Sequence, residues 1–134
     1  MAVKIFENRT TETGLEYTIT NDLIFEFTRN GRSVSKSSEK SDAVLTGVIA
    51  SERIITISRR QQQSPLERRV YLTFDLKLTR ADDRVIWSVA NVSDFEAYDV
   101  GSDKSVTDSN KRRAIETLSK RFAEKMYNRL TEDF

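Results

Sequence analysis

The sequence contains no cysteine and no histidine, and it has only one proline and four glycines in 134 residues. Without cysteine there is no disulfide framework and no thiol chemistry, and zinc lacks its two commonest ligands. Without histidine, acid–base catalysis near neutral pH lacks its usual residue. The glycines are too scattered to form a phosphate-binding loop. We therefore expect a protein that is not an enzyme, with no catalytic residues, no metal and no cofactor.

Long apolar runs and a strong net charge are also missing. No stretch approaches the roughly 20 apolar residues that span a bilayer, and no signal peptide is recognisable. The chain opens directly on a strand pattern, which is compatible with an engineered start on a trimmed mature domain. Although 32% of the residues are charged, the net charge is only +1, so electrostatic recognition must be local. The length predicts a single domain over residues 1–134.

Three long strands are predicted in the middle of the chain, over residues 43–58, 66–79 and 85–97. Gly47 in the first of them marks a bulge or a close packing point, and a shift of the apolar positions in the third predicts a bulge near Ala90. Residues 81–84 form the tight turn before the third strand. The second strand has the clearest alternation: Val70, Leu72, Phe74, Leu76 and Leu78 alternate with Tyr71, Thr73, Asp75, Lys77 and Thr79.

Two amphipathic helices flank these strands. The first opens at a capping-box pattern, Thr13 with Glu16, and stops at Asn30-Gly31. The second follows a polar loop over 98–106, is capped by Ser105 or Thr107, and runs to about Leu130. A short strand is expected over 3–6, and a weak one over 33–37. The apolar stripes of the helices are Leu15, Ile19, Leu23, Ile24 and Phe27, and Ile115, Leu118, Phe122, Met126 and Leu130.

These elements predict an α+β fold, a two-layer α/β sandwich with both helices on one face of a mixed, mainly antiparallel sheet. The order is β-α-β-β-β-α, with a possible extra short strand. The first strand should pair in parallel after a right-handed crossover. The other face of the sheet, carrying Tyr71, Thr73, Asp75 and Lys77, should be open to solvent or a partner. The expected common core contains Leu23, Phe27, Leu72, Phe74, Leu76, Ile115, Leu118 and Phe122.

The loop between the first two long strands carries the strongest functional signal. Its proline, Pro65, is bracketed by the pairs Arg59-Arg60 and Arg68-Arg69, with Glu67 as the only carboxylate. Guanidinium groups grip phosphate or carboxylate through paired hydrogen bonds, so a rigid hairpin holding four of them is suited to an anionic ligand. The alternative is that these arginines only keep edge strands soluble.

Several segments resemble the LptE family of lipopolysaccharide-assembly lipoproteins. The resemblance covers nearly the whole chain and rests on the small size, the two helices and the proline-bearing hairpin loop. The resembling segments are 3–10 (VKIFENRT), 21–27 (NDLIFEF), 42–47 (DAVLTG) and the final helix over 114–130. The first of these is also similar to curli-secretion and penicillin-binding-protein-activator lipoproteins.

The resemblance implies a non-catalytic, Gram-negative outer-membrane lipoprotein that faces the periplasm. Family members are anchored by a lipidated cysteine that follows a signal peptide; this chain has neither, so the anchor is implied by the family alone. The implied role is to plug and help assemble the LptD β-barrel and to bind lipopolysaccharide, with no nucleic-acid partner. By position in the hairpin, the implied lipopolysaccharide contacts are Arg59, Arg60, Arg68 and Arg69, followed by Arg53 and Lys77.

Two other classes remain open at this point. One is a regulatory outer-membrane lipoprotein that acts by protein contact, as an activator of a cell-wall synthase or in secretion; a co-purifying synthase in place of LptD would indicate it. The other is a small nucleic-acid-binding domain. The net charge near zero and the lack of aromatic residues among the arginines disfavour that class.

Overall fold

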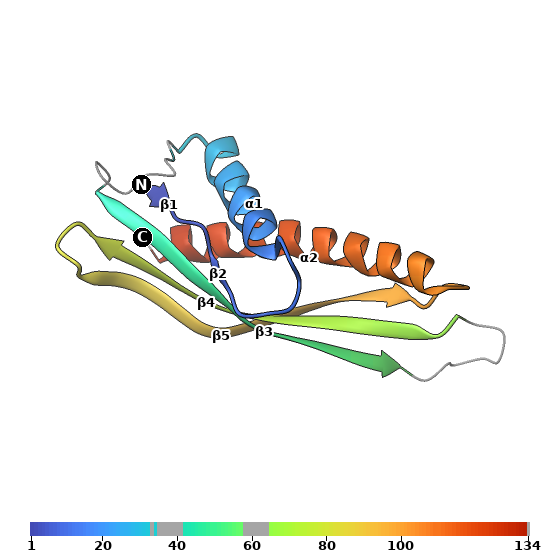
Figure 1. Cartoon of the computed structure of the whole chain (residues 1–134). Coiled ribbons are helices and arrows are strands. Elements are labelled where there is room, and N and C mark those ends of the chain that lie inside the picture. Colours follow the sequence, from blue (N-terminus) through green and yellow to red (C-terminus); the bar gives the residue numbers. More distant parts are fainter. Residues whose placement is uncertain (33, 35–41, 58–64, 134) are drawn as a thin grey trace.

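The computed structural model describes residues 1–32, 34, 42–57 and 65–133. Two helices and five strands follow one another in an open α+β fold, as predicted (Figure 1). The elements are β1 (Ala2–Val3), β2 (Glu7–Asn8), α1 (Leu15–Arg29), β3 (Ala43–Ile57), β4 (Glu67–Arg80), β5 (Val85–Asp99) and α2 (Lys104–Glu132). The weak strand expected over 33–37 falls almost entirely outside the described residues.

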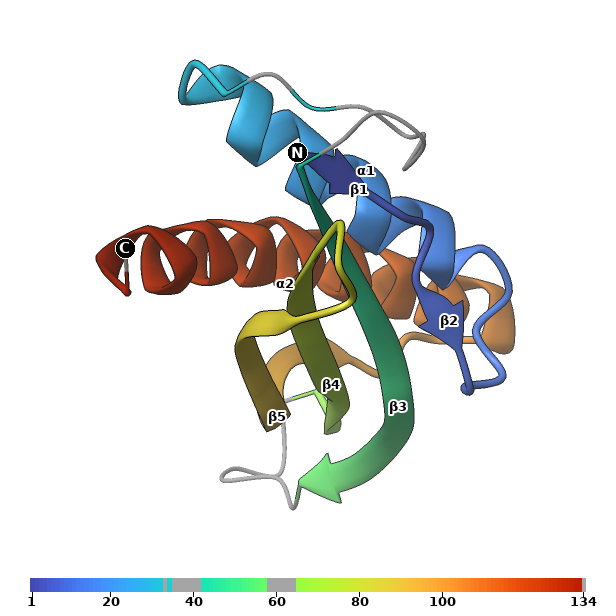
Figure 2. The same cartoon turned by 90° about the vertical axis from the view of Figure 1, so that its left-hand side faces the viewer.

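The five strands form one mixed sheet, and both helices cover the same face of it (Figure 2). The path across the sheet is β1-β3-β4-β5, and β2 also pairs with β3. The long strands are antiparallel, whereas β1 and β2 both run parallel to β3, which confirms the predicted parallel pairing of the N-terminal segment. In the described part of the chain, neither helix is both long and apolar enough to cross a membrane.

The N-terminal strand is divided in two, so the single strand predicted over 3–6 is wrong in its bounds. Val3 pairs with Leu45, and Glu7 pairs with Val48. The N-terminal segment therefore has one more residue between these two pairs than β3 has. Ile5 is therefore pushed outward and is 56% exposed, while Phe6 turns inward. The Phe6 N–H leaves the sheet and donates to Thr20 Oγ1 on α1 at 3.0 Å. This bond fixes the first helix against the sheet.

Both helices begin differently from the prediction. Gly14 precedes α1 in the left-handed conformation, at φ 86°, and no side chain caps the helix, so the Thr13–Glu16 capping box is wrong. The predicted stop is confirmed: Gly31 is left-handed, and the N–H of Arg32 bonds to the carbonyl of Phe27.

The second helix starts earlier than the sequence suggested. Asp103 is its cap, since the Asp103 carboxylate accepts the N–H of Val106 at 3.0 Å. The predicted polar loop over 98–106 is too long, because β5 continues to Asp99 and buries Tyr98 in the core.

The structure has irregular strand geometry near both positions where the sequence predicts it, Ala90 and Gly47. Two residues of β5, Ala90 and Asn91, stand opposite the single residue Asp75, which confirms the bulge near Ala90. Asn91 is left-handed, at φ 56°, and its N–H donates to Asp75 Oδ1 at 2.8 Å. Gly47 is a close packing point, since a Cβ there would lie 2.3 Å from the Phe6 ring. The bulge in β3 is at Ala50 instead.

One apolar core lies between the helices and the sheet. It contains all eight residues predicted from the helical and strand periodicities, together with Trp87, whose indole N–H donates to Asp133 Oδ2 at 2.6 Å. The stripe of α2 packs over β4 and β5, and α1 packs beside α2. Within the described residues, no helix covers the opposite face of the sheet (Figure 2).

Candidate binding face of the sheet

The face of β3, β4 and β5 that points away from the helices is called the open face below. Its side chains come from the polar half of the β4 alternation and from the residues paired with them on β3 and β5. Tyr71 in β4 pairs with Arg53 in β3 and with Phe95 in β5, so these three side chains form one row across the sheet. The next row towards the hairpin loop contains Arg69.

Arg53, Arg69, Tyr71 and Phe95 form an arginine–aromatic cluster on the open face. The rings of Tyr71 and Phe95 are 5.1 Å apart. Arg53 Cζ lies 5.1 Å from the centre of the Tyr71 ring, and Arg69 Cζ lies 5.2 Å from the centre of the Phe95 ring. Each cation is thus held against an aromatic face, which orders the guanidinium while leaving its N–H edge able to bind another group.

The polar partners of the cluster are few. Arg69 forms an ion pair with Glu67, with 3.5 Å between Nε and Oε2; its Nε atom is buried and makes no hydrogen bond. In the described part of the chain, Arg53 has no ion-pair partner. Phe95 is 42% exposed. The cluster therefore presents two guanidinium groups and an accessible aromatic ring on the same surface.

A second feature of the open face lies further along the sheet, beside the bulge. An open hollow of about 520 Å³ is lined largely by apolar groups, including Ile5, Val48 and Ala90. Lys4 and Lys77 lie at its rim, and neither is in an ion pair within the described residues. The open face thus combines cationic groups with an apolar depression.

The six residues predicted as contacts are not all brought together. Arg53, Arg69 and Lys77 share the open face, with Lys77 further along β4. Arg68 and Arg69 lie inside β4 and not in the loop, and their side chains alternate to opposite faces. Arg68 therefore lies on the helix side, paired with the buried Tyr98. The other pair, Arg59 and Arg60, lies outside the described residues.

The aromatic half of the cluster does not follow from the sequence pattern. The alternation of β4 predicts Tyr71 on the open face but does not place Phe95 beside it. Only the register between β4 and β5 brings the two rings together. The alternation of Phe95 with Asp94 and Glu96, which turn towards α2, was the available signal.

The helix side carries a separate set of charges, which fastens α2 to the sheet. Arg121 pairs with Asp94 and with Glu96, at 3.2 and 2.7 Å. Although burial opposes it, the Arg121 hydrogen bond holds the pKa of Asp94 below its ordinary value. Among the described residues there is no group of three or more acidic side chains that could hold a metal ion.

A second, partly buried charge group joins α2 to β3 and to the segment before α1. Lys111 on α2 pairs with Glu12, before α1, and lies 3.6 Å from Glu52 in β3. Burial, reinforced by the nearby Glu12 carboxylate, raises the pKa of Glu52 to about 7. These contacts are internal, so we assign them to the stability of the fold.

Comparison with known proteins agrees with this architecture. The family model described as "LptE: Lipopolysaccharide-assembly" matches residues 1–130. A search of curated protein sequences found no match.

Several solved structures share the fold at low sequence identity. A minor lipoprotein from Acinetobacter baumannii matches with a TM-score of 0.65 and 10% identity, over 98% of this chain and 91% of that one. The rare lipoprotein B from Shewanella oneidensis matches with a TM-score of 0.61 and 7% identity, over 98% and 95%. An uncharacterized lipoprotein B from Nitrosomonas europaea gives 0.62 and 13%, over 93% and 78%.

Proposed function

The chain belongs to the LptE family of lipopolysaccharide-assembly proteins, and we propose that it performs this role by binding lipopolysaccharide on its open face while seated in an LptD-type β-barrel. Family membership gives it a role in lipopolysaccharide assembly and points to an outer-membrane lipoprotein. We further propose that the full-length protein faces the periplasm and is held in the outer membrane by an N-terminal lipid. The family is non-catalytic, which agrees with a binding role.

The arginine–aromatic cluster is the observation that supports lipopolysaccharide binding most directly. Lipopolysaccharide carries phosphate groups close to its acyl chains, so its receptor must offer cations and apolar surface side by side. Arg53 and Arg69 supply planar donors that match phosphate. Their stacking on Tyr71 and Phe95 fixes the two guanidinium groups before the ligand arrives, which lowers the entropy cost of binding.

The hollow beside Lys4 and Lys77 supports the same proposal from the other part of the open face. Its apolar lining and volume of about 520 Å³ suit a segment of an acyl chain or another apolar group. Four charged groups line the hollow. The ammonium groups of Lys4 and Lys77 suit a phosphate, whereas the Glu7 carboxylate is paired with Arg9 and the Asp75 carboxylate accepts the Asn91 N–H. Lys77 therefore remains a proposed contact.

The arginines near the hairpin loop complete the proposed contact set. Arg59 and Arg60 precede Pro65, and Arg68 follows it. We propose that Arg59 and Arg60 also contact lipopolysaccharide, together with Arg69. Arg68 belongs to this set by its place in the sequence, although its side chain starts on the other face of β4.

A barrel partner is consistent with the surface as a whole. The lumen of a large outer-membrane barrel is polar, and this chain has 32% charged residues with a net charge of only +1. Charge complementarity would then set the fit more than apolar area.

Direct titration of lipopolysaccharide tests the proposed site. The double variant Arg53→Gln/Arg69→Gln should bind at least about tenfold more weakly, since it loses two charge-assisted contacts. The matched control is Arg112→Gln/Arg129→Gln, which removes two exposed arginines from α2. Equal affinity of the two double variants, with normal circular dichroism, would contradict the assignment of the open face.

A further inference from the structure

The outer edge of β5 is a free edge of the sheet in the described part of the chain, since β5 pairs only with β4. In an antiparallel pair, successive residues point their N–H and C=O groups alternately towards the partner and away from it. The Val100 N–H donates to the Leu66 carbonyl at 2.8 Å. With the register of β4 and β5, this bond directs the backbone groups of Asp99, Ala97 and Phe95 outward.

Side chains of α2 cover two of these three positions. Asn110 Nδ2 donates to the Asp99 carbonyl at 3.0 Å, and the guanidinium of Arg121 donates to the Phe95 carbonyl. The Phe95 N–H donates to Asp94 Oδ1 at 2.9 Å. Between them, the N–H and C=O of Ala97 have no hydrogen-bond partner among the described residues. Ala97 is thus the one residue of these three whose outward N–H and C=O both lack a partner among the described residues.

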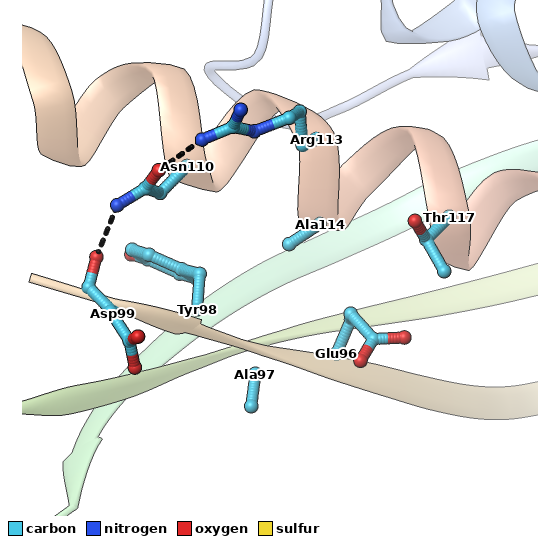
Figure 3. Close-up of a pocket in the computed structure, with 8 residues that line it drawn as sticks. All are labelled: Glu96, Ala97, Tyr98, Asp99, Asn110, Arg113, Ala114 and Thr117. Atoms are coloured by element: carbon cyan, nitrogen blue, oxygen red, sulfur yellow. Dashed lines mark hydrogen bonds between the residues drawn. The ribbon is translucent and has the colours of Figure 1, made fainter.

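A hollow lies at this unprotected point (Figure 3). Its volume is about 300 Å³, and it is open to solvent between the end of β5 and the second to fourth turns of α2. The α2 residues that line it, Asn110, Arg113, Ala114 and Thr117, follow the spacing of one helical face. In Figure 3 the helix forms the upper wall, and Glu96, Ala97 and Asp99 lie along the lower one.

Arg113 supplies a cation at the rim of this hollow. Its guanidinium donates to Asn110 Oδ1, and it has no carboxylate partner within the described residues. The nearby Glu96 carboxylate is already paired with Arg121. Arg113 is therefore the cation of this site that remains available to a ligand.

We propose that the hollow receives an extended peptide segment with an acidic side chain, which adds to the edge of β5 at Ala97. One residue of the peptide would accept the Ala97 N–H and donate to the Ala97 C=O, as in strand addition. The acidic side chain would pair with Arg113. This site is separate from the open face, because the hollow lies on the helix side of the sheet.

The chemistry of the hollow favours a peptide over a phosphate. Phosphate oxygens at neutral pH mainly accept hydrogen bonds, so a phosphate would leave the Ala97 carbonyl unpaired. It would also meet the carboxylates of Glu96 and Asp99. A peptide backbone offers a donor and an acceptor at one residue, which matches Ala97 on both counts.

The test uses the ¹⁵N-labelled chain and synthetic peptides of alternating Thr and Val with one central Glu. Amide shifts on titration should centre on Ala97 and the residues lining the hollow. Replacing the peptide Glu by Gln should weaken binding about tenfold, and methylating the backbone nitrogen of the peptide should weaken it further. The protein variant Arg113→Gln should bind the Glu peptide and the Gln peptide equally well. The variant Arg112→Gln, which changes a different face of α2, should still bind the Glu peptide more tightly.

Substitutions of Ala97, at the edge of β5, provide a second test of the proposal. Ala97→Pro removes the outward N–H without removing a bond to β4, and it should abolish the shifts; Ala97→Val keeps the N–H and should retain them. Because the methylated peptide tests the same bond on unaltered protein, a folding defect of Ala97→Pro does not decide the result. Shifts that do not include Ala97, no binding at all, or equal affinity for the methylated peptide would overturn the proposal.

Discussion

The ring of Phe122 on α2 stacks on the ring of Phe74 in β4, with centroids 3.8 Å apart and an angle of 20° between the planes. Both side chains are fully buried, at 1% and 0% exposure. This stack joins the middle of the long helix to the middle of the sheet. It lies at the place where two separate sequence periodicities meet, the helical stripe and the alternation of β4.

Replacing Phe122 by alanine should therefore cost about 3–5 kcal/mol of folding stability. The loss combines the transfer of a buried ring with the cavity that it leaves against Phe74. Urea denaturation of the variant and of the parent chain measures it. A loss below about 1 kcal/mol would contradict the packing of α2 on β4.

Gly47→Ala should destabilise the fold through a single neighbour. The new Cβ would lie 2.3 Å from the Phe6 ring, which is buried and cannot swing into solvent. We expect a loss of about 1–3 kcal/mol, as in other overpacked cores. In a Phe6→Leu background the same change should cost less, and additive losses in this double-mutant cycle would show that Phe6 is not the cause.

Because of Glu52, the free energy of unfolding should decrease as the pH rises towards neutrality. Burial and Glu12 raise its folded pKa from 4.5 to about 7. Between these values the folded state holds a proton that the unfolded chain has released, so the unfolding free energy decreases with pH. The penalty is absent below about pH 4.5 and complete above about pH 7.

The variant Glu52→Gln has no such proton to release. Its unfolding free energy should fall less than that of the parent chain between about pH 5 and about pH 8. Glu116→Gln, on the exposed side of α2, is the control and should follow the parent. Parallel curves for Glu52→Gln and the parent would contradict the raised pKa.

The layer architecture could be predicted from the sequence because burial imposes a period on each element. The alternation from Val70 to Leu78 and the stripe from Ile115 to Leu130 each specified a buried face, and both faces are buried as expected. The glycine that ends α1 was also readable, since a left-handed residue is needed there.

The details that escaped prediction depend on partners far away in the sequence. The N-terminal strand breaks at Phe6 because Thr20 takes its N–H. The start of α2 is fixed by Asp103, in a loop that is shorter than predicted because β5 extends to Tyr98 and Asp99.

The same limit applies to the candidate site. Arg68 and Arg69 are neighbours in the sequence, but strand alternation places their side chains on opposite faces of the sheet. The register then joins Arg69 to an aromatic pair that no local motif reveals.

The barrel partner can be tested from the outer surface of the helical layer. A photocrosslinker at Arg112, which is exposed on α2, should capture an LptD-type barrel in cells that make the full-length protein. The same probe at the buried Leu118 should capture nothing. Efficient capture of a cell-wall synthase, with no barrel adduct, would favour the activator class instead.

The most direct test of lipopolysaccharide binding on the open face is a photocrosslinker at Thr73, in the row next to Tyr71. In living cells this probe should form adducts that react with an antibody to lipopolysaccharide, and Arg53→Gln/Arg69→Gln should greatly reduce them. A probe at Glu116, on the exposed side of α2, should form few such adducts. Lipopolysaccharide adducts that are strong at Glu116 and absent at Thr73 would contradict the account.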